Sequence, residues 1–449
     1  MIIESGISFF VNALLLLRVA LLAGAPLLMF GCYGRSASVG QQAGTSNPPV
    51  VPETAKSAYH FVNSIGVNTH LNYFDRTYGN FPLVERELES IGIRHVRDGI
   101  HLQDADYNNT LYGRWGSLGK IGVRFDAVLD PRSNLGPVTA SLLNQVNVLA
   151  AQTIESFEGP NELDVSNIPG WANVDRTYQA VVYSSTTSMT GGNLIKVLGP
   201  SMANASNGSQ VGEISGSLDD GNLHPYPAAQ MPSVVFPSQP DLAKLMSGDK
   251  EIVFTESGYH NALNDHSDQP AVSETAAAKY IPRLFLEDFA QGIPRTFLYE
   301  LFDEAPDPGL TNFQMHWGLV RANGSEKPAF TAMRNMIGEL SDTADPVQLQ
   351  QLAWSLSTPN AQTHHLLLQK STGEFDLVLW KEVSSYDPKR QADINTPAEA
   401  AVLNLGQQAK SITLYEPTDQ PQPIQTLTNV ASVPLQIPDH PLVVKILLK

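Results

Sequence analysis

The chain has 449 residues, 42% of them hydrophobic, so it can bury more than one core and two domains are expected. Asp and Glu number 45 against 28 Lys and Arg, which gives a formal net charge of −17 at pH 7. A surface of this charge repels nucleic acid and anionic lipid, so neither is expected as a partner, whereas a neutral polymer is compatible with it.

The N-terminal segment has the features of a targeting sequence. Arg18 precedes an apolar run that contains Pro26 and ends at Cys32, the only cysteine. The run is short for a membrane span, so residues 1–32 are predicted to be a signal sequence and the protein to be exported, either extracellular, periplasmic or attached by lipid to an outer surface. The end of the run resembles a bacterial lipoprotein cleavage site, although the residues before the glycine depart from the usual pattern, so lipid attachment at Cys32 stays open. Residues 33–57, rich in Ser, Gly, Gln and Pro, are predicted to be a flexible linker.

Between residues 58 and 343, eight apolar runs alternate with segments of helical periodicity. The predicted strands are 65–71, 93–98, 121–129, 154–162, 195–200, 222–226, 251–256 and 296–302. The predicted helices are 82–91, 138–150, 175–188, 273–290 and 329–340. This alternation predicts parallel βα units, and eight of them suit a closed (β/α)8 TIM barrel. An open doubly wound sheet usually has a Gly-rich turn after its first strand, and the residues after Asn68 contain no such turn.

The pattern changes after about residue 344. Short alternating strands are predicted at 365–369, 375–380, 400–405, 411–415, 431–437 and 442–448. We therefore expect an α/β fold in which the barrel is followed by a C-terminal all-β sandwich over 344–449, packed on the barrel as a support.

Polar side chains follow most of the predicted barrel strands. They are Asn68 and His70, Arg97 and Asp98, Glu158, Asn161 and Glu162, His224 and Tyr226, Glu256, and Tyr299 and Glu300. In such a barrel the C-terminal strand ends form the active site, and burying these groups unpaired costs several kcal/mol. Glu162 and Glu256, at the ends of strands four and seven, could be the acid/base and the nucleophile of a retaining glycosidase.

Asn161-Glu162 on strand four and Thr255-Glu256 on strand seven resemble glycoside hydrolase clan A, in particular its β-xylosidase-like and cellulase-like members with a C-terminal β-sandwich. The resemblance implies that Glu162 is the acid/base and Glu256 the nucleophile. It also implies that Arg97 braces the nucleophile.

Further positions agree with this clan, and one departs from it. His224-Pro-Tyr226 lies where a His or Tyr holds the site, and the segment that ends in Lys327-Pro328 resembles the clan's segment after strand eight. Many members have a Trp on strand eight under the sugar, whereas this chain has Tyr299-Glu300-Leu301-Phe302. Trp317 or Phe302 could take that role, and the identity of the sugar stays open.

The residues also predict the charge state of the two glutamates. Glu162, beside another carboxylate in a closing pocket, should hold a proton, because desolvation and like charge disfavour ionisation. Glu256, beside Arg97 and a tyrosine hydroxyl, should stay ionised and attack the anomeric carbon, with the carboxyls roughly 5–5.5 Å apart. Asn161 is expected to donate to the sugar 2-hydroxyl.

The other predicted substrate contacts are His224, Tyr226, Tyr299, Glu300, His70, Glu158 and Trp317. Glu158 either lines the pocket or pairs with Arg97, and Asp98 and Asp126 are expected to brace neighbours. Trp115 and Trp317 are either sugar platforms or half-buried packing residues. Residues 264–268 look metal-like but are ordinary loop formers, so neither a metal nor a cofactor is predicted.

The predicted function is retaining hydrolysis of a glycosidic bond, most simply β-linked, in an oligo- or polysaccharide. The sequence is also compatible with two alternatives. One is a catalytically inactive surface carbohydrate-binding protein on the same scaffold. The other is a transglycosylase.

Overall fold

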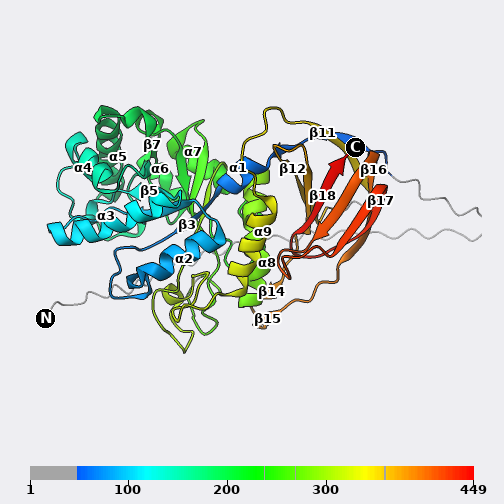
Figure 1. Cartoon of the computed structure of the whole chain (residues 1–449). Helices are drawn as coiled ribbons and strands as arrows, with labels where there is room; N and C mark the ends of the chain where they lie inside the picture. Colours follow the sequence, from blue (N-terminus) through cyan, green and yellow to red (C-terminus); the bar gives the residue numbers. More distant parts are fainter. Residues whose placement is uncertain (1–47, 237, 268, 358–360) are drawn as a thin grey trace, which may run out of the picture. The chain divides into compact units, whose positions relative to one another are not determined.

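The computed structural model describes residues 48–236, 238–267, 269–357 and 361–449 (Figure 1). The predicted signal sequence, including Cys32, lies outside the described residues. No helix within the described ranges is long and apolar enough to cross a lipid bilayer.

Eight parallel strands form the predicted barrel. They are β3 (Ile65–Asn68), β4 (His95–Gly99), β5 (Arg124–Val128), β6 (Ile154–Glu158), β7 (Lys196–Leu198), β8 (Gly221–Leu223), β9 (Ile252–Ser257) and β10 (Thr296–Leu298). Their order in the sheet is β7-β6-β5-β4-β3-β10-β9-β8. A parallel bridge between Leu198 and Asp220 joins the two ends, so the sheet closes as the sequence predicted.

Helices follow the strands and cover the barrel (Figure 1). They are α1 (Ala58–Asn63), α2 (Phe81–Ile91), α3 (Ala105–Lys120), α4 (Ala140–Leu149), α5 (Trp171–Ser188), α6 (Gly208–Val211), α7 (Gln239–Ser247), α8 (Glu274–Ala290) and α9 (Pro328–Leu340). Local signals set several of their ends. Thr139 and Ser273 cap the first turns of α4 and α8 with their hydroxyls, and α2 ends at Gly92 with φ 83°.

Strand register brings polar residues to one level of the barrel interior. Asn68 on β3 pairs with Arg97 on β4, Arg97 pairs with Asp126 on β5, and Asp126 pairs with Ser156 on β6. All four residues are buried. A layer of polar side chains therefore replaces apolar packing near the C-terminal end of the strands.

The C-terminal β domain is one folded sheet with a short extra hairpin. Its strands are β1 (Val51–Thr54), β2 (Lys56–Ser57), β11 (Gln351–Leu356), β12 (Thr363–Gln369), β13 (Phe375–Lys381), β16 (Glu399–Tyr415), β17 (Gln425–Ile437) and β18 (Leu442–Leu448), and the hairpin is β14 (Tyr386–Asp387) with β15 (Ala392–Asp393). The predicted strands 400–405 and 411–415 are one strand, β16, with a register shift between Asn404 and Ala409. Its first half pairs with β11 and its second half with β18, and buried residues of all three strands share one apolar core.

The predicted linker 33–57 is wrong at its C-terminal end. Val51–Thr54 pairs antiparallel with β11, and Lys56–Ser57 pairs with β12. The Lys56 ammonium also donates to the last carbonyls of α8, and the Ser57 hydroxyl caps α1. The edges of β11 and β12 offer unpaired backbone groups, and this segment satisfies them, which its Pro- and Ser-containing composition does not reveal.

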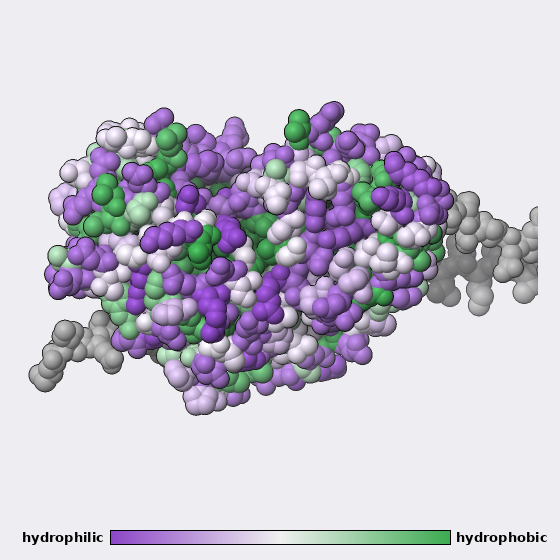
Figure 2. Space-filling view, in the orientation of Figure 1, coloured by the Kyte–Doolittle hydropathy of each residue, from purple (hydrophilic) through white to green (hydrophobic). Residues whose placement is uncertain are grey.

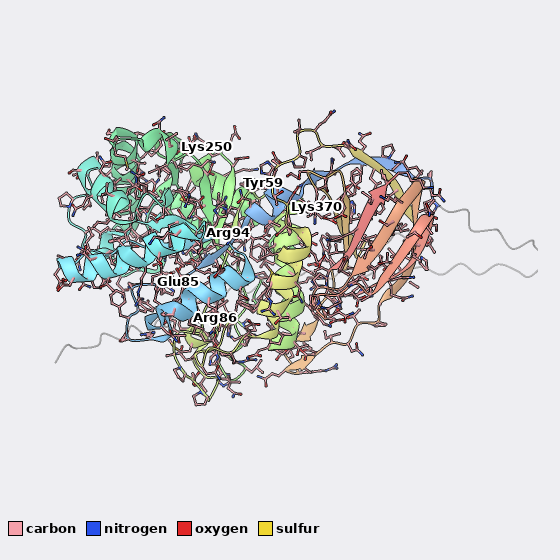
Figure 3. All side chains as sticks on the ribbon, in the orientation of Figure 1. Tyr59, Glu85, Arg86, Arg94, Lys250 and Lys370 are labelled. Atoms are coloured by element: carbon pink, nitrogen blue, oxygen red, sulfur yellow. The ribbon has the colours of Figure 1, made fainter. Side chains whose placement is uncertain are left out.

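The other face of the sheet packs against the barrel helices. Buried residues of β12, β13 and β18 belong to the same apolar cluster as α8 and α9. Trp380 is fully buried and donates to Glu287 on α8, and Arg283 of α8 donates to Lys381 and Val383 carbonyls. Lys370, labelled in Figure 3, donates to a carbonyl at the end of α9.

These contacts give the β domain the supporting position that the sequence predicted. Trp380 and Tyr386 are both buried, so neither presents a ring to solvent as a sugar platform. On the face shown in Figure 2 hydrophilic residues dominate, and hydrophobic residues are scattered in small groups.

Candidate active site

Arg97 occupies the floor of the barrel mouth and uses all five of its N–H groups. Nε and Nη2 donate to the two oxygens of Glu158, each over 2.7 Å. Nη1 donates to Glu256 at 2.6 Å and to Asn68 at 2.9 Å, and Nη2 donates to Asn161 at 2.7 Å. The guanidinium therefore fixes residues from three other strands or their following turns, β3, β6 and β9, around one point.

Glu256 lies on β9 and has partners on both oxygens. Oε1 accepts from Arg97, and Oε2 accepts from the Tyr226 hydroxyl at 2.7 Å. His224 Nδ1 lies 3.5 Å from the same Oε2. Three groups from β4 and the β8 end thus orient this carboxylate, which agrees with the prediction that Arg97 braces it.

Glu162 lies on the turn after β6. Its backbone is left-handed, with φ 48° and ψ 49°, a conformation that costs a non-glycine residue about 1–2 kcal/mol. Its N–H donates to the Ser201 carbonyl, and Asn161 forms a bridge with Ser201. Gly159 permits the turn, because a Cβ there would lie 1.9 Å from the Gln179 amide oxygen.

His224 connects the two glutamates. Its Nδ1 lies 2.8 Å from Glu162 Oε1, and its Nε2 contacts the Thr255 hydroxyl at 3.0 Å. One oxygen of Glu162 and one of Glu256 lie within 4.8 Å of one another. An oxygen separation of no more than 4.8 Å is compatible with the roughly 5–5.5 Å between the carboxyl groups of a retaining pair, and it lies below the roughly 6.5–9.5 Å of an inverting pair.

The surroundings set the charges of this group. Burial by itself raises the pKa of Glu256, but the charges of His224 and Arg97 and the hydrogen bonds from Tyr226 and Arg97 outweigh it, so the net pKa lies below the usual range. Burial lowers the pKa of His224, whereas the charge of Glu256 and the contact with Glu162 raise it, and the net pKa lies above 6.5. Glu256 is therefore an anion at neutral pH, as predicted.

A cavity of about 820 Å³ opens above these residues. Among the predicted site residues, those that line it are Glu162, Glu256, Asn161, Arg97, Tyr226, Tyr299, His70 and Trp317. Asn161 Oδ1 is taken by Arg97 and by the Ser201 hydroxyl, so its Nδ2 is the group that can donate to a bound molecule.

Three predicted substrate contacts lie below the cavity instead. Glu158 is fully buried and paired with Arg97, so of its two predicted roles the structure shows the pairing. His224 is buried between the two catalytic candidates. Glu300 is fully buried, accepts from the Tyr78 hydroxyl at 2.8 Å and lies 3.4 Å from His70. The structure thus corrects the expected direct contacts of Glu158, His224 and Glu300.

Of the aromatic residues considered as sugar platforms, one lines the cavity and two are buried in the core. Trp317 faces the cavity and packs edge-on against Tyr226 and Tyr299, so it is placed to take the role that strand eight leaves open. Phe302 is fully buried, and Trp115 stacks on Phe125 in the core, so neither is a sugar platform. Asp98 braces the backbone after β3 by accepting from the Thr69 hydroxyl and the Leu71 N–H, as expected.

Sequence reasoning missed one wall of the cavity. Asp130 and Arg132 follow β5, line the cavity and pair with each other, and Arg132 also donates to the Asn161 carbonyl. The other missed lining residues with polar side chains include Asn72, His101, Asn134, Gln269 and Gln314. The sequence Asp130-Pro131-Arg132, directly after the third predicted strand, could have indicated that charged side chains line the cavity here.

Two groups at the site combine a histidine with two carboxylates at metal-ligand spacing. They are Glu162, His224 and Glu256, and His70, Glu300 and Glu304. In the first group, the carboxylates already accept hydrogen bonds from Arg97 and Tyr226 or lie against His224. Burial lowers the pKa of His70 to about 4, and its Nε2 contacts the Tyr299 hydroxyl at 3.1 Å.

No protein-family model and no curated protein matches the sequence. Among solved structures, a monomeric beta-xylosidase from Caulobacter crescentus CB15 has a TM-score of 0.60 at 12% identity, over 88% of this chain and 98% of that chain. A glucosidase from Croceicoccus marinus has a TM-score of 0.58 at 11% identity, over 82% and 92%. The GH39 enzyme from Xanthomonas axonopodis pv. citri has a TM-score of 0.56 at 13% identity, over 88% and 96%. The chain therefore has the two-domain fold of these proteins, as the resemblance to clan A implied.

Proposed function

We propose that the chain is a retaining glycoside hydrolase that cleaves β-glycosidic bonds in oligo- or polysaccharides, with Glu162 as acid/base and Glu256 as nucleophile. The observation that carries this proposal is the carboxylate pair. Its oxygens lie within 4.8 Å of one another at the wall of the cavity, and one member is held as an anion. The similar folds of a xylosidase and a glucosidase support the same reaction class.

In the first step the Glu256 carboxylate attacks the anomeric carbon, and protonated Glu162 donates its proton to the glycosidic oxygen. The bond between that oxygen and the anomeric carbon breaks, the alcohol leaves, and a glycosyl ester of Glu256 forms. Arg97 and Tyr226 hold both carboxylate oxygens, which leaves the nucleophile little freedom to rotate away from the sugar.

In the second step Glu162, now ionised, takes a proton from a water molecule whose oxygen attacks the anomeric carbon. The ester bond breaks and Glu256 is restored as an anion, so the sugar keeps its anomeric configuration. His224 lies against both carboxylates and is placed to stabilise whichever of them carries the negative charge.

A panel of aryl β-glycosides, beginning with β-xylosides and β-glucosides, tests the reaction class. We expect the wild type to release the aryl alcohol and NMR to show retained anomeric configuration in the first-formed sugar. Analysis with added sugar acceptors separates hydrolysis from transglycosylation. Binding of glycans without turnover on any member of the panel would favour the inactive carbohydrate-binding protein.

Alanine variants test the two roles separately. Glu256→Ala should lose turnover, since no covalent intermediate can form. Glu162→Ala should still act on aryl glycosides with good leaving groups, and added azide should trap its intermediate as a glycosyl azide of unchanged configuration. Glu213→Ala, an exposed glutamate outside the cavity, serves as the control. Equal activity of Glu256→Ala and the control would refute the assigned nucleophile.

We also propose that the protein acts outside the cytoplasm, because the apolar run before Cys32 has the composition of a signal sequence. Cell fractionation of the wild type and Cys32→Ala tests this. Export of both with membrane attachment of the wild type alone would support lipid attachment at Cys32.

A further inference from the structure

A second cluster of potential ligands lies at one end of the β domain, among residues that do not line the cavity. Glu416 and Asp419 lie on the turn after β16, and His440 lies on the connection between β17 and β18. Tyr415 at the end of β16 pairs with Val443 on β18, so the residues just beyond these strand ends meet. One oxygen of each carboxylate and one ring nitrogen lie within 4.8 Å of one another.

The His440 imidazole has a buried nitrogen that faces this cluster. The residue is only 9% exposed, and its Nε2 is ion-paired with Asp419 but has no partner within hydrogen-bond distance among the described residues. Nε2 lies 3.7 Å from Asp419 Oδ2, beyond hydrogen-bond distance. Two ligands held at about 2.0–2.2 Å by a tetrahedral zinc ion are roughly 3.4 Å apart, so this pair needs only a small closure to share one cation.

The other ring nitrogen has the environment of a metal-bound histidine. Nδ1 of His440 lies 3.4 Å from Asp439 Oδ1. Asp439 Oδ2 in turn accepts from the Lys279 ammonium at 3.0 Å and from the Ser385 hydroxyl at 2.9 Å. A carboxylate behind the histidine orients the ring and raises its basicity as a ligand, and here it also neutralises the nearby lysine.

We propose that Glu416, Asp419 and His440 form a binding site for a divalent cation of the zinc class. Two carboxylate oxygens and one imidazole nitrogen are the ligand types that such a cation takes, and water completes its coordination. The Asp419 side chain is 60% exposed, which gives the ion a path and the ligand freedom to move inward. The bound cation links the β16–β17 turn to the β17–β18 connection and stabilises the fold.

Zinc titration of the full chain tests the site, with Asp419→Asn as the decisive variant because it removes one exposed oxygen ligand and keeps the shape of the side chain. Asp345→Asn is the matched control, since Asp345 is also exposed and lies 3.1 Å from the ring of His60. All proteins carry Glu162→Gln, which removes a ligand from the group at the cavity.

We expect Zn²⁺ to bind the control and raise its melting temperature, and Asp419→Asn to bind it at least about 10-fold more weakly and to lose the thermal shift. Asp439→Asn, which keeps all three ligands, should lose affinity by about 10- to 100-fold. Equal zinc affinity of Asp419→Asn and the control, or the absence of zinc binding to the control, would overturn the proposal.

Discussion

Arg97 holds Glu158 through two parallel hydrogen bonds of 2.7 Å each, beneath a cavity that Glu158 does not line. The same guanidinium donates to Glu256 at 2.6 Å. Glu158 does not touch the proposed nucleophile, Glu256, but it holds the arginine that positions it. The position of Glu256 therefore depends on Glu158 through Arg97. One arginine compensates two buried carboxylates, so the site and the stability of the barrel are coupled.

Arg97→Met should lower both the stability and the activity of the protein. The substitution leaves Glu158 and Glu256 buried without their cation, and breaking a buried ion pair in this way costs about 3–5 kcal/mol. We expect urea unfolding to show a loss of this size and kcat/KM on an aryl glycoside to fall by about 100-fold or more.

The double variant Arg97→Met/Glu158→Gln is the control for this result. Removing the second charge should restore much of the free energy of unfolding, because the amide does not need a cation. Activity should stay low, since Glu256 still lacks its partner. Recovery of both stability and activity would show that Arg97 has no part in orienting the nucleophile.

Tyr226→Phe should move the acidic limb of the pH–activity profile. The hydroxyl hydrogen bond helps to hold the pKa of Glu256 below its usual range, so its loss raises that pKa and activity is lost at a higher pH. A hydrogen bond to a charged group is worth about 1.5–3 kcal/mol, which corresponds to roughly one to two pH units. The hydroxyl of Tyr299 contacts His70 and not Glu256, so Tyr299→Phe should leave the acidic limb of the kcat/KM profile unchanged. An equal shift of this limb in both variants would contradict the role assigned to Tyr226.

His224 predicts a specific dependence of stability on pH. Its pKa is raised in the folded chain, so its stabilising contribution is complete below the unfolded pKa of about 6.5 and is lost as pH rises through the folded value. The difference in free energy of unfolding between wild type and His224→Gln should therefore shrink from pH 6 to pH 8. Burial lowers the pKa of His95, so the corresponding difference for His95→Gln should change in the opposite direction. Parallel changes in the two variants would contradict the raised pKa of His224.

The barrel and the central pair could be predicted because each rests on a local pattern. Apolar runs of strand length alternate with helical periodicity, and Arg97 on β4, Glu256 on β9 and Glu162 on the turn after β6 lie on or after barrel strands whose side chains must converge. Whether a polar residue lines the cavity or is buried beneath it could not be predicted from such a pattern. Glu158 ends β6 and Glu300 follows β10, but both are fully buried and neither lines the cavity. No sequence pattern reports how deep such a residue lies.

The remaining errors concern partners distant in sequence. Val51–Thr54 becomes a strand because β11, about 300 residues later, offers it an edge. Arg132 belongs to the cavity wall because its guanidinium donates to the carbonyl of Asn161, which lies 29 residues later on the turn after β6. Both depend on tertiary contacts that a short window of sequence does not contain.

The N-terminal strands can be tested by truncation. A chain that begins at residue 58 lacks the pairing of β1 and β2, the buried Ala55 and the Ser57 cap of α1. We expect it to be less stable than a chain that begins at residue 48 by about 2 kcal/mol or more, of which the cap alone contributes about 1. Urea unfolding of the two chains measures this difference, and equal midpoints would restore the linker interpretation for 51–57.

Glu300→Gln tests the corrected position of strand eight. Burial raises the pKa of Glu300 well above its usual range, so the folded chain holds it as a neutral acid and loses stability as pH rises above about 4.3. The amide removes this loss, so Glu300→Gln should match the wild type near pH 4 and exceed it at pH 7 by at least about 1 kcal/mol. Because Glu300 does not line the cavity, kcat/KM should stay within about 10-fold of wild type, whereas Glu256→Gln should be inactive. If both variants are equally inactive, Glu300 takes part in the reaction and the predicted direct contact with the sugar is correct after all.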